Sequence, residues 1–299
     1  MSTIDQARSQ RVGLLLALGV FLTWGLFPSY FKLLAAVPAV EVLSHRIVWS
    51  AVFMAVLLPL GGGVAAFRRA LRDGRVVGLI GLSALLIGVN WLTYVATITS
   101  GHVLEASLGY FLAPLTNVAL GRLVLGERLT RLQLVACLMA LSAVAALALG
   151  TEGEIWRALV LAISFGFYGL VRKTVRVEAL PGNTLECFLL VPFAAIYLAW
   201  QAAAGSIHFG AALPGTSTLL ALSGVVTAVP LIAYAAAARR LKLSTLGLMQ
   251  FLTPSMAFLL GAFVYGEPFG RTKLACFAVI WTALALYGRE TVRLARRPA

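Results

Sequence analysis

The chain has 299 residues, of which 61% are hydrophobic and only 12% are charged. A soluble domain cannot bury so much apolar surface, whereas a lipid bilayer accommodates it, so the composition predicts an all-α integral membrane protein. The formal net charge of +13 comes mostly from Lys and Arg at the ends of apolar runs, which indicates membrane topology and argues against nucleic acid as a partner.

Ten apolar runs are long enough to span a bilayer, because a spanning helix needs about 20 mostly apolar residues. In chain order, the expected transmembrane helices are Val12–Leu34, Val40–Leu60, Val76–Thr99, Val103–Leu125, Leu132–Leu149, Ile155–Lys173, Thr184–Ala203, Ser217–Ala238, Leu243–Tyr265 and Leu274–Gly288. The polar start of the chain and the length of the first run argue against a cleavable signal peptide.

Basic residues gather in alternate connections, beginning ahead of the first span and ending after the tenth. Arg271, with its neighbour Lys273, is the exception to this alternation. The positive-inside rule therefore predicts that both termini are cytoplasmic, with residues 1–11 and 289–299 as tails.

One stretch of the chain occurs twice: Leu108–Glu127 recurs 140 positions later as Leu248–Glu267. The matched residues include Pro, Gly and Glu at fixed offsets, which apolar filler does not produce, so we interpret the match as an internal duplication. Each copy belongs to a unit of five spans, and an odd number inverts the second copy in the membrane. We therefore expect two inverted five-helix repeats, residues 12–149 and 155–288, an organisation that many secondary transporters use.

Ionisable residues inside the spans each cost about 2.5–3.5 kcal/mol at a helix centre, so each requires a reason. The candidates are Glu41, His45, Arg46, Glu105 and Glu186. Glu41 and Glu105 begin their spans, where a carboxylate also suits the helix dipole, so structural and functional interpretations both stay open. Asn183 and Glu186 resemble a capping box, which favours a structural role. His45 and Arg46 have no such reason, and the nearest acidic partner on their helix is Glu41.

Neutral polar and aromatic residues in the spans are further candidates for a solute-binding or coupling site. They are Trp24, Asn90, Trp91, Tyr94, Tyr110, Tyr168, Tyr234 and Gln250. Any one aromatic residue is more typical of packing or of a lipid-facing surface, and Trp24 with Trp91 is the preferred lining pair. The counterparts of this polar set in the second repeat are poor in charge, such as Thr245 for Glu105. This asymmetry predicts a gate or a proton-coupling site in the extracellular half.

Pro114 and Pro254 occupy equivalent places inside the fourth and ninth spans, and each removes one backbone hydrogen bond. A fixed kink and a hinge are both open interpretations. The turns after these spans are marked by Gly126, Glu127, Gly266 and Glu267. Each Glu is expected to pair with the Arg four residues later.

Several stretches resemble EamA-type transporters of the RarD kind, within the drug/metabolite transporter superfamily. The stretches that carry the resemblance are LSHRIVWS (Leu43–Ser50), GVNWLTYVA (Gly88–Ala96), HVLEASLGYFLAPLTN (His102–Asn117), FGFYGLVRK (Phe165–Lys173), LSTLGLMQF (Leu243–Phe251) and YGE (Tyr265–Glu267). The resemblance implies two EamA repeats, a central cavity lined mainly by helices one, three and four with their repeat mates, and a place in the bacterial inner membrane. Ala113 departs from the family pattern, in which Asn is expected before the proline.

The leading hypothesis is a secondary active transporter, a permease or exporter, that moves a small organic metabolite or drug by alternating access, with proton coupling through Glu41, His45 or Glu105. No G-x-x-x-x-G-K-[ST] motif is present, which argues against direct use of ATP. The alternatives are a membrane-embedded enzyme, for which HExxH and GxSxG motifs are lacking, and a passive channel or uniporter. We expect no metal and no cofactor. The expected partners are the bilayer and a small-molecule substrate, and a homodimer stays open.

Overall fold

The computed structural model describes residues 3–99, 103–149, 155–210, 215–264 and 270–295. Within these ranges the chain is helical, and no β-strand occurs. The elements are α1 (Thr3–Lys32), α2 (Ala39–Leu60), α3 (Val64–Arg72), α4 (Gly74–Thr99), α5 (Val103–Leu123), α6 (Arg131–Leu149), α7 (Ile155–Thr174), α8 (Ala179–Ala203), α9 (Thr216–Ala238), α10 (Leu243–Gln250), α11 (Leu252–Leu259), the π-helix η1 (Leu260–Val264) and α12 (Arg271–Ala295).

Six of the described helices are long and apolar enough to cross a bilayer: α1, α2, α4, α6, α8 and α9. Large apolar side chains cover their outer surfaces, and Leu15, Phe193 and Ile196 are 69%, 73% and 69% exposed. Lipid tails solvate such a surface, whereas water disfavours it. The all-helical membrane class is therefore confirmed, and the count of ten spans stays a prediction.

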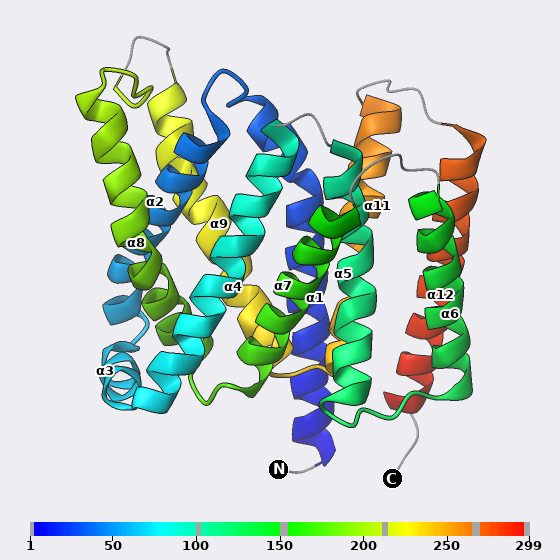
Figure 1. The fold of residues 1–299 in the computed structure, drawn as a ribbon. Coiled ribbons are helices and arrows are strands. Elements are labelled where there is room, and N and C mark those ends of the chain that lie inside the picture. The colour runs from blue at the N-terminus through cyan, green and yellow to red at the C-terminus, as the bar shows by residue number, and fades with distance from the viewer. Residues whose placement is uncertain (1–2, 100–102, 150–154, 211–214, 265–269, 296–299) are drawn as a thin grey trace.

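Helices that are far apart in the sequence pack together across the bundle (Figure 1). α2 packs against α8 and α9, α4 against α7 and α8, and α1 against α9 and α11. α5 packs against α7 and α10, and α6 packs against α12. A Cβ on Gly224 of α9 would lie only 2.3 Å from the backbone carbonyl carbon of Trp49 in α2. These two helices therefore touch backbone to backbone, as small residues permit in membranes.

The ninth expected span is broken into three pieces. α10 ends at Gln250, α11 begins at Leu252, and the π-helix η1 follows. Pro254 lies in the first turn of α11, where a missing N–H removes no intrahelical bond, whereas Pro114 lies inside the continuous helix α5. The expectation of one continuous helix from Leu243 is wrong, and the two prolines occupy different backbone settings.

Glu127 caps a helix that begins 116 positions later in the chain. Gly126 turns the chain after α5 with a φ of 63°, and Glu127 Oε1 accepts a 2.6 Å hydrogen bond from the backbone N–H of Leu243. Its Oε2 accepts bonds of 2.9 Å and 2.6 Å from the N–H and the hydroxyl of Ser244. A carboxylate suits the unpaired N–H groups at the start of α10. Among the described residues no ion pair joins Glu127 to Arg131, so that expectation is wrong.

We expect Glu127→Ala to destabilise the protein by about 1–2 kcal/mol, because the start of α10 loses its cap. Thermal unfolding of the purified protein in detergent measures this as a lowered Tm. Arg131→Gln is the matched control, since it removes the charge that local spacing would pair with Glu127. Equal losses in the two variants would contradict the capping role.

Candidate functional site

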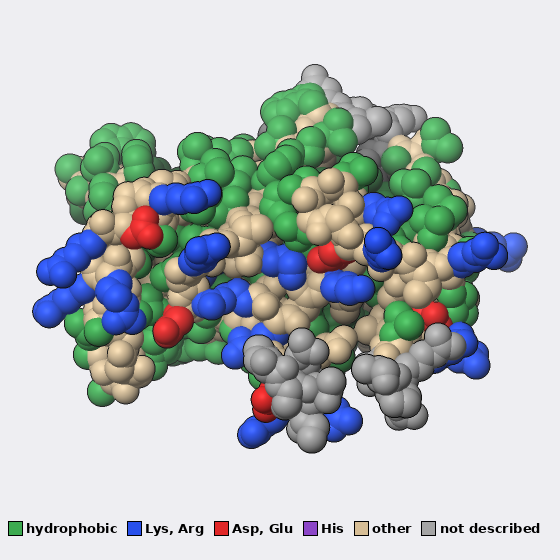
Figure 2. All heavy atoms as spheres, turned by 90° about the horizontal axis from the view of Figure 1, so that it is seen from below, with side chains coloured by type: hydrophobic (Ala, Val, Ile, Leu, Met, Phe, Trp, Pro, Cys, Tyr) green, Lys and Arg blue, Asp and Glu red, His purple; other side chains and the backbone are tan. Residues whose placement is uncertain are grey.

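Basic side chains gather on one face of the bundle, which we call the basic face (Figure 2). Both ends of the chain lie on this side in Figure 1, as do the connections α2–α3–α4, α5–α6, α7–α8 and α9–α10. The short helix α3, which was not expected, contributes Arg69 and Arg72 in its last turn. Lys32, Arg157 and Arg271 lie at the opposite ends of their helices.

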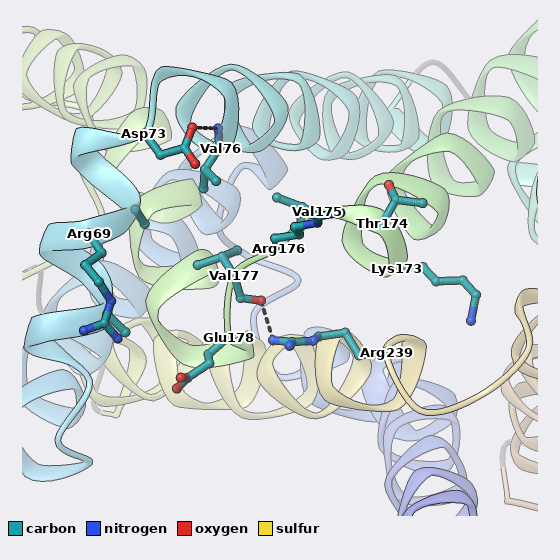
Figure 3. Close-up of a pocket in the computed structure, with 12 residues that line it drawn as sticks. Arg69, Asp73, Val76, Lys173, Thr174, Val175, Arg176, Val177, Glu178 and Arg239 are labelled. Carbon is teal, nitrogen blue, oxygen red and sulfur yellow. Dashed lines mark hydrogen bonds between the residues drawn. The ribbon is translucent and has the colours of Figure 1, made fainter. Parts of the chain in front are cut away.

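A pocket of about 580 Å³ opens between α3, α4, the end of α7 and the end of α9 (Figure 3). Its charged lining consists of Arg69, Asp73, Lys173, Arg176, Glu178 and Arg239. Apolar residues that also line it belong to a buried hydrophobic cluster, which we call the apolar plug: Ala70, Val76, Ile80, Val175, Val177 and Leu185. The basic pocket therefore ends on an apolar layer.

Arg46, on α2, lies at the centre of an aromatic cluster nearer the opposite face. Its guanidinium carbon lies 5.0 Å from the ring centre of Phe31, 5.1 Å from that of Trp91 and 5.8 Å from that of Phe27. Its Nε donates a 2.9 Å hydrogen bond to the hydroxyl of Thr227 on α9. Cation–π contacts of this kind stabilise a cation by about 0.5–2 kcal/mol each.

Two phenols complete this group: the ring centres of Tyr94 and Tyr110 are 5.3 Å apart, and both phenols are within electrostatic reach of Arg46. We call the set the Arg46 cluster: Phe27, Phe31, Arg46, Trp91, Tyr94 and Tyr110. The helices α1, α2, α4 and α5 supply it. Every member is partly exposed, and the cluster lies within roughly two turns of the helix ends on the side opposite the basic face.

Arg46 has no carboxylate partner in the part of the chain that the structure describes. Glu41, the nearest acidic residue on the same helix, lies 3.9 Å from His45 but makes no recorded ion pair with Arg46. A guanidinium that keeps its charge and is lined by aromatic rings can hold the anionic group of a small, flat, partly apolar molecule.

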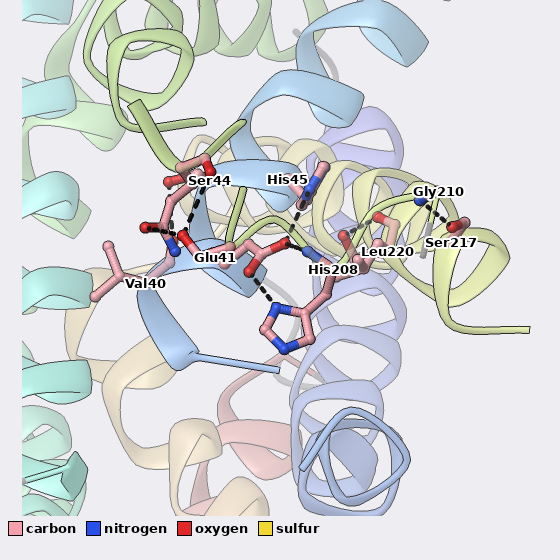
Figure 4. Close-up of polar contacts among 11 residues, drawn as sticks. Val40, Glu41, Ser44, His45, His208, Gly210, Ser217 and Leu220 are labelled. Carbon is pink, nitrogen blue, oxygen red and sulfur yellow. Dashed lines mark hydrogen bonds and ion pairs between the residues drawn. The ribbon is translucent and has the colours of Figure 1, made fainter. Parts of the chain in front are cut away.

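Glu41 instead fastens the loop after α8 (Figure 4). Its carboxylate accepts a 2.7 Å hydrogen bond from the backbone N–H of His208 and lies 2.8 Å from Nδ1 of the same residue. His45 Nε2 lies 3.9 Å from the carboxylate, and its ring stacks on Phe209 with centres 4.9 Å apart. Glu41 is fully buried, so water does not compete for these bonds. These contacts support a structural role for Glu41, and a coupling role for Glu41 or His45 stays a prediction.

We expect Glu41→Ala to release the loop, because His208 loses the acceptor for both its backbone N–H and its ring. Hydrogen exchange at residues 205–210 then becomes faster by roughly 10-fold or more, the equivalent of losing one charge-assisted hydrogen bond. Ser44→Ala is the control on the same helix, since its hydroxyl donates its hydrogen bond to the carbonyl of Val40 within that helix. Unchanged exchange at His208 in Glu41→Ala would rule out the fastening role.

An aromatic layer lies in the core of the bundle. The ring centre of Tyr234 is 5.6 Å from that of Trp24 and 5.7 Å from that of Tyr168, against which it stacks. Trp24 also meets Phe165 at 5.8 Å. Trp91 packs against the buried hydrophobic cluster to which Phe165, Tyr168 and Tyr234 belong, and its ring also lies 5.1 Å from the guanidinium carbon of Arg46.

Two of the polar candidates join helices. Asn90 Nδ2 donates hydrogen bonds to the carbonyl of Leu161 at 2.8 Å and to the hydroxyl of Ser164 at 3.0 Å, both on α7. Asn117 Nδ2 donates a 2.9 Å bond to Gln250 Oε1 on α10. All of these contacts are buried, which supports packing roles, and contact of Asn90 or Gln250 with solute stays a prediction.

Glu186 does not cap a helix. α8 begins at Ala179, so Glu186 lies two turns inside it and the capping-box interpretation is wrong. Its Oε1 accepts a 2.6 Å hydrogen bond from the hydroxyl of Ser83 on α4, and its Oε2 lies 3.8 Å from Nη1 of Arg172 on α7. Arg172 and Glu186 are only 2% and 3% exposed.

We call the buried polar set around this pair the Arg172 cluster: Tyr168, Arg172, Asn183, Glu186 and Tyr234. From the sequence, Arg172 is only one of the basic residues that end a span, because such a residue looks the same whether it faces water or the bundle. The side chain of Glu105, and the whole of Gly266 and Glu267, lie outside the described residues.

Comparison with known proteins adds to this geometry. The model of the EamA-like transporter family matches residues 11–149. The chain is 43% identical over 292 residues to Protein RarD of Escherichia coli (strain K12), which covers 97% of this chain and 98% of that protein. It is 42% identical over 281 residues to the "Uncharacterized transporter YojE" of Bacillus subtilis (strain 168), covering 92% and 93%. A crystal structure described as "Crystal structure of protein" shares the fold, with a TM-score of 0.74 over 97% of this chain and 100% of that one, at 18% identity.

A bundle of apolar helices with lipid-compatible outer surfaces and polar clusters inside defines a multi-pass membrane protein. The chain belongs to the EamA-like transporter family, among its members of the RarD type, and is a membrane transporter.

Proposed function

We propose that the chain is a secondary active transporter that moves a small organic anion across the bacterial inner membrane by alternating access. The Arg46 cluster carries this proposal. A charge inside a membrane protein needs a counter-charge, and the described chain offers Arg46 only rings and one hydroxyl. A solute with an anionic group and a flat apolar body satisfies both the guanidinium and its aromatic neighbours.

Unequal exposure of the two ends supports alternating access. The members of the Arg46 cluster are partly exposed, whereas the Arg172 cluster is buried, with the apolar plug close to it on the basic-face side. Gly182 illustrates this proximity, because a Cβ there would lie 2.9 Å from both Arg172 and Val177 of the plug. We take this as a conformation that is open toward the face opposite the basic one.

We further propose two inverted five-helix repeats, residues 12–149 and 155–288, as the frame for that movement. The 140-residue offset relates α2 to α8, α5 to α10 and α6 to α12, and each of these helices packs against its own counterpart. Two halves of opposite orientation can exchange conformations, which exposes one site to each side in turn. Proton coupling is part of the proposal, and a passive uniporter is the alternative.

We expect the basic face to be cytoplasmic, because Lys and Arg concentrate there. Arg72→Cys lies on that face, and Ser206→Cys lies in the exposed loop near the opposite one. In intact cells a membrane-impermeant maleimide should label Cys at 206 and not at 72. The parent chain is the control, since Cys137, Cys187 and Cys276 are buried. The reverse labelling pattern would refute this orientation.

We expect Arg46→Met to abolish transport. Arg46→Lys should retain a small part of the transport activity, because lysine keeps the positive charge but lacks the planar guanidinium. In proteoliposomes, uptake of radiolabelled benzenesulfonate tests this, since a sulfonate stays charged at every working pH and does not cross lipid as a neutral acid. Loss of one charge-assisted contact weakens binding by roughly 10- to 150-fold.

Two controls accompany this measurement. Benzenesulfonamide, neutral and of similar shape, should not compete with benzenesulfonate. Arg157→Met removes an arginine whose recorded ring contact, with Trp156, is outside the cluster, and it should transport normally. Wild-type uptake by Arg46→Met would overturn the assignment of the site. Accumulation against a gradient by wild type separates active transport from the passive alternative.

A further inference from the structure

The repeat offset relates the members of the Arg172 cluster to those of the Arg46 cluster. The offset is 140 positions for residues of α2 and α4, and 141 positions for residues of α1. The counterparts are Arg46 and Glu186, Tyr94 and Tyr234, Phe31 and Arg172, and Phe27 and Tyr168. The two clusters thus draw on equivalent positions in the two halves of the chain.

Their contacts correspond as well. Arg46 of α2 bonds to a hydroxyl of α9, and Glu186 of α8 bonds to a hydroxyl of α4. Arg46 lies over the ring of Phe31 on α1, and Glu186 lies beside Arg172 on α7. The same arrangement of helices therefore holds a cation near one face, with no counter-ion among the described residues, and an ion pair near the other.

The ion pair is incompletely bonded for groups so deeply buried. Oε2 of Glu186 and both Nε and Nη1 of Arg172 have no hydrogen-bond partner among the described residues. The hydroxyl of Tyr168 and the amide of Asn183 are also without one, and both side chains are fully buried. Such groups are normally satisfied in a protein interior. Their concentration at one place, with a separation of 3.8 Å in the ion pair, indicates a site that is completed by another molecule.

We propose that the Arg172 cluster is a second anion-binding station, used when the transporter opens toward the basic face, and that Glu186 carries the coupling proton. This inference rests on the proposed function. In the conformation described, the Glu186 carboxylate is the counter-ion of Arg172. When the basic-face end opens, one proton from solution adds to that carboxylate and gives a neutral acid. Arg172 stays protonated and pairs with the anionic group of the solute.

Glu186 is the residue to which we assign the proton, because few other ionisable groups lie beside it. Arg172 and Tyr168 face it from α7, Ser83 faces it from α4, and Cys187 is its neighbour on α8. The helices α2, α3 and α9 also pack against α8, and among their described residues no ionisable group is recorded that interacts with Glu186. Tyr234 of α9 faces Arg172 instead. The proton on Glu186 therefore depends chiefly on what Arg172 is paired with.

This exchange keeps the net charge of the Arg172 cluster constant. The empty transporter holds Arg172 with the Glu186 anion, and the loaded one holds Arg172 with the solute anion and neutral Glu186. On return to the conformation described, the solute leaves toward the opposite face, and Glu186 releases its proton to that same side and pairs with Arg172 again. One proton therefore moves with each monoanion, in the same direction, and no net charge crosses. With Glu186→Gln, loading the site adds one uncompensated negative charge, so transport becomes sensitive to membrane potential.

The test uses the full chain in proteoliposomes with benzenesulfonate as the probe and pyranine inside as the pH indicator. For wild type we expect internal acidification during uptake and no response to a potassium–valinomycin potential. A gradient of about one pH unit then supports about tenfold accumulation, the limit for one proton per anion. Glu186→Gln should lose the acidification and the accumulation, keep benzenesulfonate exchange and respond to the potential. Glu290→Gln, which changes a carboxylate paired with Arg293 on α12, is the matched control and should behave as wild type.

Glu186→Gln leaves Arg172 buried without a counter-ion, so the variant can fail to fold. The double variant Arg172→Gln with Glu186→Gln has no such charge and provides the second measurement. It should still bind benzenesulfonate through Arg46, seen as quenching of tryptophan fluorescence, while net transport and proton movement fall at least tenfold, to background.

The outcomes separate the inference from the function on which it rests. No benzenesulfonate uptake by wild type, together with no competition by other aromatic sulfonates or carboxylates, overturns the proposed organic-anion function and the inference with it. Wild-type uptake that follows the membrane potential without acidification overturns the inference alone. Proton movement that persists in Glu186→Gln or in the double variant also overturns it.

Discussion

Every charge placed inside this bundle needs a counter-charge or an equivalent, because the surrounding lipid offers none. The carboxylate of Glu41 contacts the ring of His208, and Arg172 forms an ion pair with Glu186. Arg46 contacts aromatic rings and one hydroxyl, and no carboxylate among the described residues pairs with it. The two arginines therefore differ, since Arg172 has a counter-ion from the protein and Arg46 is left for the solute.

Long-range contacts position several of the buried charged and amide side chains of this protein. Glu41 reaches a residue 167 positions away, Asn117 reaches Gln250 at 133, and Glu127 reaches Leu243 at 116. Each of these bonds joins the first half of the chain to the second. A change at one end of such a bond is therefore felt in both halves, which suits a transporter whose halves must move in concert.

Hydropathy and helical spacing predicted the helical membrane class and most helix positions, because both depend on local apolar length. They also placed Arg46, Trp91, Tyr94 and Tyr110 among the site candidates, since polar residues within apolar runs stand out. Partners could not be predicted in this way, because they depend on which helices pack together. Glu186 was taken for a cap because the start of α8 was set five residues too late.

The role of Arg172 in a buried cluster was not predicted, because basic residues end many of the spans. Its inward direction follows only from the packing of α7 on α4. The break between α10 and α11 was not predicted either, because an apolar run looks the same in the sequence whether or not the helix is interrupted within it. The two halves of the chain nevertheless differ at this position in a way that marks Arg172. At the fixed offset, the first repeat has the apolar Phe31 where the second repeat has the charged Arg172.

The pairing of α2 with α8, α5 with α10 and α6 with α12 has one more consequence. In a two-fold symmetric dimer, a helix at the symmetry axis packs against the same helix of the other subunit. Under the proposed repeat, the contact between the halves is thus a dimer interface preserved within one polypeptide. Fusion freed each half to diverge, and an arginine could become a glutamate on one side only, which two identical subunits could never have achieved.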